Sequence, residues 1–290
     1  WGIEGKPRLI EEAKLAPEEE TPPPPNPIVV DTRALTNADL KRMAEEEKRK
    51  QREVAARTPG RTTPKRTDRP QRATSPVTLS AAIMAHPDRT DHVTETQTRL
   101  DREVKVVWDE KNDRWDTGRR AWLAYDPSKT HHAVIQDDLI IPEDLLAGIE
   151  RALAHIPRDA PLVGYLGKVR PHRERMRKLA AEADAANASW VTMSEVHWGP
   201  LIVLPTAHIP AMIDFCDGLT GVANYDMRLS RYWEERGARV FYTWPSIVDH
   251  LDGESLVPGR VGASRVAHRF CGADTSVLDL DWNGPVIHGK

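Results

Sequence analysis

The sequence predicts an α/β domain with a mainly parallel sheet flanked by helices, preceded by a disordered N-terminal arm. Two observations favour this fold class. After residue 76, short apolar runs alternate with segments of helical spacing, which is typical of β-strands joined by crossover helices. All but one of the nine tryptophans lie after residue 100, whereas many of the 23 prolines lie before residue 80. We therefore expect an arm of residues 1–75 and a folded domain of residues 76–290.

The arm combines a proline tract, a charged segment and a basic run. Residues 22–25 are consecutive prolines, which favour an extended polyproline helix. Asn37 can cap a helix that runs to residue 57, but this segment has almost no apolar stripe and would stay solvated. Arginine and lysine then recur between residues 57 and 72. This basic run either docks on an acidic partner or forms a solvated linker, and runs of like charge are more often solvated.

In residues 77–166, apolar runs predict strands, and apolar residues spaced by three or four predict helices. The first run ends at His86-Pro87, because proline followed by polar residues stops a strand. Pro142 is expected to begin a helix, since proline favours the first helical turn. The strands are expected at residues 79–85, 104–108, 132–135 and 162–166, and the helices at residues 93–103, 114–125 and 142–153.

The second half of the domain has a less regular pattern. A charged, alanine-rich stretch predicts a helix at residues 170–188. Two further helices are expected at residues 209–216 and 224–236, and strands at residues 201–204 and 239–243. We find no internal repeat in the sequence.

Composition excludes several classes of protein. A net charge of −3 gives no general attraction to nucleic acid or to a membrane surface. The two cysteines, Cys216 and Cys271, are too few for a disulfide framework and lack the spacing of a metal site. No apolar run approaches the roughly 20 residues that a membrane-spanning helix needs. We expect a cytoplasmic protein that does not interact with membranes.

Polar side chains follow three of the expected strands. His86 comes after the first strand, Asp109 after the second, and Asp137 with Asp138 after the third. In parallel sheets, ligands bind beyond the carboxyl ends of the strands. Two adjacent buried carboxylates repel each other, and a bound Mg²⁺ or Mn²⁺ removes that cost. We assign Asp138 to the metal and Asp137 to ribose hydroxyls or a second metal contact. The alternative is that both belong to an ordinary strand-to-helix turn.

Several segments of the chain resemble known enzymes. They are AHPDR (85–89), HHAVIQDD (131–138), WGPLIVLP (198–205), NYDMR (224–228) and YTWPSIVDH (242–250). In this order, across about residues 78–270, they resemble the small glycosyltransferases encoded by actinobacterial phages. The acidic pair after a strand also resembles the Asp-X-Asp element of GT-A-type glycosyltransferases, with Gln136 in place of the first aspartate. The resemblance implies a GT-A-like (Rossmann-like) fold, a nucleotide-sugar donor and a metal-dependent transfer.

The resemblance also suggests roles for individual residues. His250, on a loop after a strand, is a second candidate metal ligand, although a lone histidine is more often packed or exposed. We expect the donor to contact residues near the strand ends and two other arginines. Each of these residues could instead stabilise a turn, cap a helix or lie exposed on the surface. These residues are His86, Arg89, Asp109, Arg119, Asp137 and Arg265.

Asp226 is the candidate catalytic base. A transfer that inverts the anomeric centre needs a group that takes the proton of the acceptor hydroxyl. Asp226 lies at the start of a helix in the second half of the domain, a position that the helix dipole favours for aspartate without any catalytic role. The acceptor is expected to be a virion protein or modified DNA.

Two other functions remain possible from the sequence. A metal-dependent nucleotidyltransferase also needs carboxylates at strand ends and cationic phosphate ligands. A virion or scaffold protein with a degenerate transferase domain would need no catalytic residues. The expected fold gives no structural reason for Asp137, Asp138 and His250 to occur together. Their presence therefore favours an enzyme over a degenerate transferase domain.

Overall fold

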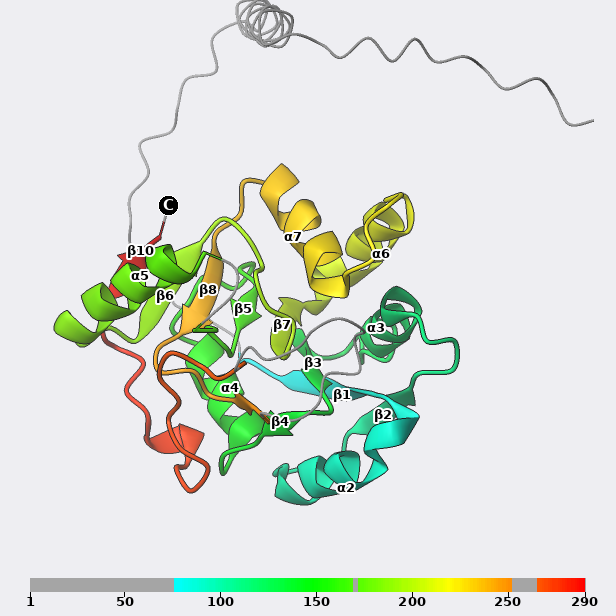
Figure 1. Cartoon of the computed structure of the whole chain (residues 1–290), viewed down its shortest axis with the longest axis horizontal. Coiled ribbons are helices and arrows are strands. Elements are labelled where there is room, and N and C mark those ends of the chain that lie inside the picture. Colours follow the sequence, from blue (N-terminus) through cyan, green and yellow to red (C-terminus); the bar gives the residue numbers. More distant parts are fainter. Residues whose placement is uncertain (1–75, 169–171, 252–264, 290) are drawn as a thin grey trace, which may run out of the picture. The chain divides into compact units, whose positions relative to one another are not determined.

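A mixed eight-stranded sheet crosses the folded part of the protein, with helices on both of its faces (Figure 1). The structure is a computed structural model of the 290-residue chain, and it describes residues 76–168, 172–251 and 265–289. The predicted arm of residues 1–75, with its basic run and its charged helix, lies outside the described residues. The prediction of an α/β domain with a mostly parallel sheet is confirmed.

The strand order across the sheet is β10-β6-β8-β5-β7-β3-β1-β2. Neighbouring strands are parallel in the pairs β1–β2, β1–β3, β5–β8 and β6–β10, and antiparallel in β3–β7, β5–β7 and β6–β8. The strands are β1 (Leu79–Ala85), β2 (Lys105–Trp108), β3 (His131–Gln136), β5 (Leu162–Val163), β6 (Trp190–Met193), β7 (Leu201–Pro205), β8 (Val240–Thr243) and β10 (Val286–His288). The first three strands therefore form the expected parallel unit, while the rest of the sheet is mixed.

The helices follow the connections between the strands. They are α2 (Thr90–Arg99), α3 (Arg114–Trp122), α4 (Leu145–Leu153), α5 (Arg173–Ala185), α6 (Ile209–Asp217) and α7 (Tyr225–Glu235), with short 3₁₀ helices η1 (Pro87–Arg89), η2 (Thr206–His208) and η3 (Val277–Asp279). Right-handed crossovers from β1 to β2 and back to β3 place α2 and α3 on opposite faces of the sheet. Figure 1 shows α3, α6 and α7 on one side and α2 and α4 on the other.

Helix α4 begins later than the sequence predicts. The expected start at Pro142 is wrong, because α4 begins at Leu145. Glu143 instead forms a bridge with Ser276, and the Ser276 hydroxyl donates to the Asp144 carboxylate at 2.6 Å. The backbone φ angle of Asp144 is 53°, and an α-helix cannot continue through a residue with this positive angle. The C-terminal segment therefore fixes the residues before α4 in a non-helical conformation.

The core lies on both faces of the sheet and contains most of the tryptophans. The indole rings of Trp190 and Trp282 lie 5.0 Å apart between their centroids. Trp198, Tyr242 and Trp244 are also buried. Cys216 is buried and Cys271 half-buried, and both are free thiols. Among the described residues, no helix combines the length and apolar character needed to cross a membrane.

Candidate functional site

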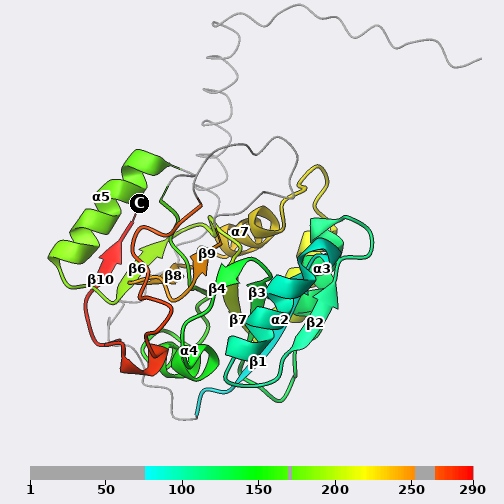
Figure 2. The same cartoon turned by 60° about the horizontal axis from the view of Figure 1, so that its bottom comes forward.

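A two-stranded sheet joins the acidic pair to a distant part of the chain. It consists of β4 (Leu139–Ile140), directly after the acidic pair, and β9 (Asp249–His250). The strands run antiparallel, with Leu139 opposite His250, and the Leu251 N–H donates to the Asp138 carbonyl at 2.8 Å. This pairing holds the His250 imidazole next to the carboxylate of Asp138. The elements lie close together in Figure 2.

The Asp138 carboxylate has one oxygen in an ionic cluster and one oxygen without a partner. Its Oδ2 atom lies 2.5 Å from Arg89 Nη1, 3.4 Å from His250 Nε2 and 3.6 Å from Arg265 Nη1. Its Oδ1 atom is buried and accepts no hydrogen bond from any described residue. The side chain is only 7% exposed. A buried carboxylate oxygen is costly to leave unpaired, so this atom is available for a ligand.

Each oxygen of the Asp137 carboxylate accepts a hydrogen bond inside the protein. Its Oδ2 atom accepts from the His86 backbone N–H at 2.6 Å, and its Oδ1 atom accepts from Arg89 Nη1 at 2.9 Å. Burial raises the pKa of Asp137 and the charge of Asp138 raises it further, while the two hydrogen bonds lower it. Asp137 therefore connects the end of β3 to the turn after β1.

Arg89 bridges the two carboxylates. Adjacent strand residues point to opposite faces, but β3 ends at Gln136, so both carboxylates can turn to the same guanidinium. Burial alone would lower the pKa of Arg89, but the charges of Asp138 and Asp137 outweigh it and raise the pKa. The sequence predicts this arginine on the donor, and the structure places it on the acidic pair.

The protonation of His250 decides what the site can bind. Burial lowers the pKa of His250, so the ring is neutral at pH 7 despite the nearby Asp138 charge. Nδ1 lies 3.0 Å from the Leu251 carbonyl oxygen, which only accepts, so Nδ1 carries the proton. The lone pair of Nε2 then faces Asp138 Oδ2. Two electron-pair donors that face each other favour a cation between them, and a histidine that donates its other N–H to a carbonyl is the usual form of a metal ligand.

Asp249 positions the segment that carries Arg265. Its Oδ1 atom accepts from the backbone N–H groups of His250 and Ala267, at 2.8 and 2.7 Å. The Tyr165 hydroxyl also donates to the Arg265 carbonyl. These contacts hold the Arg265 side chain, which is 23% exposed, near Asp138. The structure therefore brings Arg89, Asp137, Asp138, His250 and Arg265 together.

Three other predicted donor residues have different surroundings. The His86 imidazole accepts from the Asp88 N–H at 3.2 Å within its own turn. Asp109 follows β2, where its Oδ1 atom accepts from the Lys111 N–H at 3.1 Å. Arg119 pairs with Asp217 at 2.9 Å, between α3 and the end of α6. His86 and Asp109 are thus at strand ends as expected, but Arg119 makes its ion pair away from the acidic pair.

Asp226 is half-buried in the first turn of α7. The preceding residue, Tyr225, packs against Gly199, where a Cβ atom would lie 2.7 Å from the tyrosine ring and 3.0 Å from Gln136 Nε2. Gly199 is therefore needed for α7 to approach the end of β3. This packing links the start of α7 to the residue before the acidic pair.

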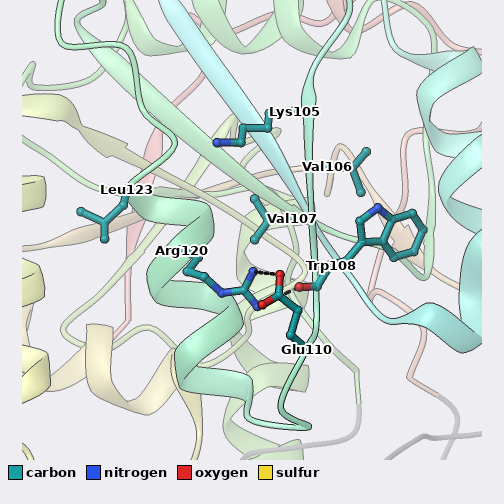
Figure 3. Close-up of a pocket in the computed structure, with 7 residues that line it drawn as sticks. All are labelled: Lys105, Val106, Val107, Trp108, Glu110, Arg120 and Leu123. Atoms are coloured by element: carbon teal, nitrogen blue, oxygen red, sulfur yellow. Dashed lines mark hydrogen bonds and ion pairs between the residues drawn. The ribbon is translucent and has the colours of Figure 1, made fainter.

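A cavity of about 370 Å³ runs along the outer edge of β2 (Figure 3). The Arg120 side chain points into it, paired with Glu110 at 3.2 Å and donating to the Trp108 carbonyl at 2.8 Å. An unpaired strand edge is prone to aggregation, and a charged side chain across it prevents further pairing. None of the predicted site residues lines this cavity, and we assign it to edge protection.

No protein-family model matches this chain, and no curated protein matches it either.

Three features of the site were not predicted from the sequence. These are the β4–β9 pairing, the positioning role of Asp249 and the packing of Tyr225 on Gly199. Strands of two residues give too short a pattern to detect. The glycine in Trp198-Gly199-Pro200 was the one visible signal, since glycine between bulky residues often marks a close approach.

Proposed function

We propose that this protein is a glycosyltransferase that transfers a sugar from a nucleotide-sugar donor with Mn²⁺ or Mg²⁺. The observation that carries the proposal is the surroundings of Asp138, whose buried Oδ1 has no partner among the described residues. Its other oxygen lies 3.4 Å from the neutral His250. The five segments that resemble phage glycosyltransferases support the same activity, and we infer a GT-A-type fold from the acidic pair at the end of a parallel strand.

The residues present fit a divalent cation. Carboxylate oxygen and imidazole nitrogen are ligands that Mn²⁺ accepts, and Mg²⁺ accepts the carboxylate. Asp138 and His250 would hold the ion, which when bound stabilises the charge of the departing diphosphate as a Lewis acid. Arg89 and Arg265 add two guanidinium groups that can form charge-assisted hydrogen bonds with phosphate oxygens.

Asp226 is the proposed base. Its carboxylate would take the proton of the acceptor hydroxyl while that oxygen attacks the anomeric carbon. The bond from that carbon to the donor phosphate breaks on the opposite face, and the nucleoside diphosphate leaves with the bonding electrons. The anomeric centre of the product is then inverted.

A thermal-shift screen tests the proposal. The full chain is heated with a panel of nucleotide sugars, each with and without Mn²⁺, beside the Asp138→Asn variant. A ligand at 100 times its Kd stabilises a protein by about 2.7 kcal/mol. We expect metal-dependent stabilisation by at least one nucleotide sugar in the wild type only, followed by slow release of free sugar. Stabilisation only by nucleoside triphosphates, with pyrophosphate release, would indicate a nucleotidyltransferase. No stabilisation by any nucleotide would indicate a non-catalytic virion or scaffold protein.

A further inference from the structure

A second cavity of about 370 Å³ lies between α7 and the loop that joins β6 to β7. Its size is at the lower end of the range of small-molecule pockets, which begins at about 300 Å³. It is lined by His172, Glu195, Val196, His197, Met227, Ser230, Arg231 and Glu234. None of these residues belongs to the cluster around Asp138.

His197 lines this cavity, and one of its ring nitrogens has no hydrogen-bond partner among the described residues. Its side chain is 4% exposed, and no described residue forms a hydrogen bond with its Nε2 atom. Burial lowers the pKa of His197, so the ring is neutral at pH 7. Nδ1 lies 3.4 Å from Glu195 Oε2, and because a carboxylate only accepts, this neighbour favours the tautomer with the proton on Nδ1. Nε2 is then an acceptor that lacks a donor.

Two carboxylates add further acceptors to the same wall. Glu195 is 40% exposed, and its Oε2 atom lies 3.4 Å from the neutral His197 ring. Glu234 accepts from the Ser230 hydroxyl at 2.7 Å and from Arg231 at 3.2 Å. Each carboxylate oxygen has two lone pairs, so both groups can accept more hydrogen bonds. The Arg231 cation is already paired with Glu234. The cavity therefore needs a ligand with several hydrogen-bond donors.

The cavity is connected to the proposed catalytic site through two short segments. Met227 and Ser230 line the cavity, and Ser230 is one helical turn after Asp226 on the same face of α7. In the loop, His197 is followed by Trp198 and Gly199, and Gly199 packs against Gln136. The cavity thus lies one helical turn from the proposed base along α7, and its loop contacts the residue before the acidic pair through Gly199.

We propose that this cavity binds a sugar unit of the acceptor, so that the protein adds its sugar to an existing carbohydrate. The inference rests on the proposed glycosyltransferase function. A pyranose ring offers several hydroxyl donors to the acceptors of His197, Glu195 and Glu234. A serine or threonine side chain offers only one hydroxyl. A nucleic-acid phosphate offers no donor at neutral pH, and the two glutamates repel it.

Saturation-transfer NMR on the full chain, without donor or metal, tests this assignment. The probes are the methyl glycosides of glucose, galactose and mannose, together with a thymidine dinucleotide and a capped threonine amide. At least one glycoside is expected to receive saturation from the protein, and the dinucleotide and the threonine amide to receive none. Glu195→Gln is expected to weaken glycoside binding about tenfold, the effect of losing a hydrogen bond to a charged group.

Two further variants separate the cavity from the rest of the surface. Met227→Trp fills the cavity from an exposed position and should abolish glycoside binding. Glu235→Gln neutralises an exposed carboxylate on α7 that does not line the cavity, and should leave the Kd unchanged. The assignment is overturned if no glycoside binds, if the dinucleotide or the threonine amide binds instead, or if glycoside binding survives both Glu195→Gln and Met227→Trp. A protein that binds glycosides here but no nucleotide sugar would contradict the proposed function alone.

Discussion

Asp137 and Asp138 are adjacent in the chain, but only Asp138 keeps a carboxylate oxygen for a ligand. Both oxygens of Asp137 accept hydrogen bonds, from the His86 N–H and from Arg89. The Oδ1 atom of Asp138 has no hydrogen bond from any described residue, although it is buried. Asp137 therefore ties the end of β3 to the turn after β1, whereas Asp138 has an oxygen that can accept a hydrogen bond from a ligand.

This difference predicts opposite effects of two matched variants. Asp137→Asn should lower the free energy of unfolding by about 1–3 kcal/mol, because the amide nitrogen would oppose the His86 N–H or Arg89. Asp138→Asn should change stability less and should remove the stabilisation by nucleotide sugar with Mn²⁺. Urea unfolding followed by circular dichroism, and thermal shifts with ligand, measure the two effects. Equal loss of stability in both variants, with ligand response retained, would contradict the assignment.

Asp226→Asn tests the proposed base. Turnover should fall by roughly 10²–10⁴-fold, the usual contribution of general-base catalysis. Donor and metal affinity should hardly change, because the proposed role of Asp226 is on the acceptor side. NMR of the wild-type product should show an inverted anomeric centre. A retained anomer, or a variant whose only defect is weaker donor binding, would rule out the role.

Gly148→Ala tests the contact between α4 and the C-terminal segment. Alanine normally stabilises a helix by roughly 0.5–1 kcal/mol relative to glycine. Here a Cβ atom would lie 2.3 Å from Val277 Cγ1, so the variant should instead lose about 1–3 kcal/mol through overpacking. Gly218→Ala is the control, since its nearest neighbour, the Phe215 carbonyl oxygen, lies at 3.4 Å. Chemical unfolding that finds the two variants equally stable would contradict this packing.

Two buried histidines on β3 predict a loss of stability in acid. Burial lowers the pKa of His131 and that of His132 to about 4, against about 6.5 in an unfolded chain. Between these values the unfolded state binds protons that the folded state does not, so stability falls as the pH drops from 6.5 towards 4. At pH 5 the loss is roughly 2 kcal/mol per histidine.

Urea unfolding at pH 7 and pH 5 measures this effect. His132→Gln keeps an amide donor for the Ala121 carbonyl, which lies 3.0 Å from Nε2, and does not titrate. The difference in unfolding free energy between the two pH values should be smaller in this variant. A wild-type protein that is equally stable at both pH values would contradict the prediction.

The sequence predicts the parallel half of the sheet well and the rest less well. Residues 79–85 form β1 as expected, since an apolar run followed by His86-Pro87 has clear limits. The predicted strand at residues 162–166 is shortened to Leu162–Val163, because the Leu166 N–H bonds to the Ser246 hydroxyl instead. The strands β6 and β10 were not predicted. Their positions depend on pairing with distant strands, which local periodicity does not record.

The residues of the candidate site that follow strand ends could be predicted from the sequence. The contacts that depend on tertiary packing could not. Asp138 and His250 were proposed together, and their side chains are 3.4 Å apart. The ion pair of Arg119 with Asp217 joins two helices and has no local signal. The cavity around His197 depends on how α7 packs on the β6–β7 loop, so neither segment predicts it alone.

The pairing of β4 with β9 also has a consequence for how the protein is made. His250 is translated long after Asp138, and contacts between distant residues form slowly because a long loop must close first. During synthesis on the ribosome, β1 to β3 can fold while Asp138 still lacks His250. The cluster of Asp138 with His250 is therefore expected to form only after β9 has emerged.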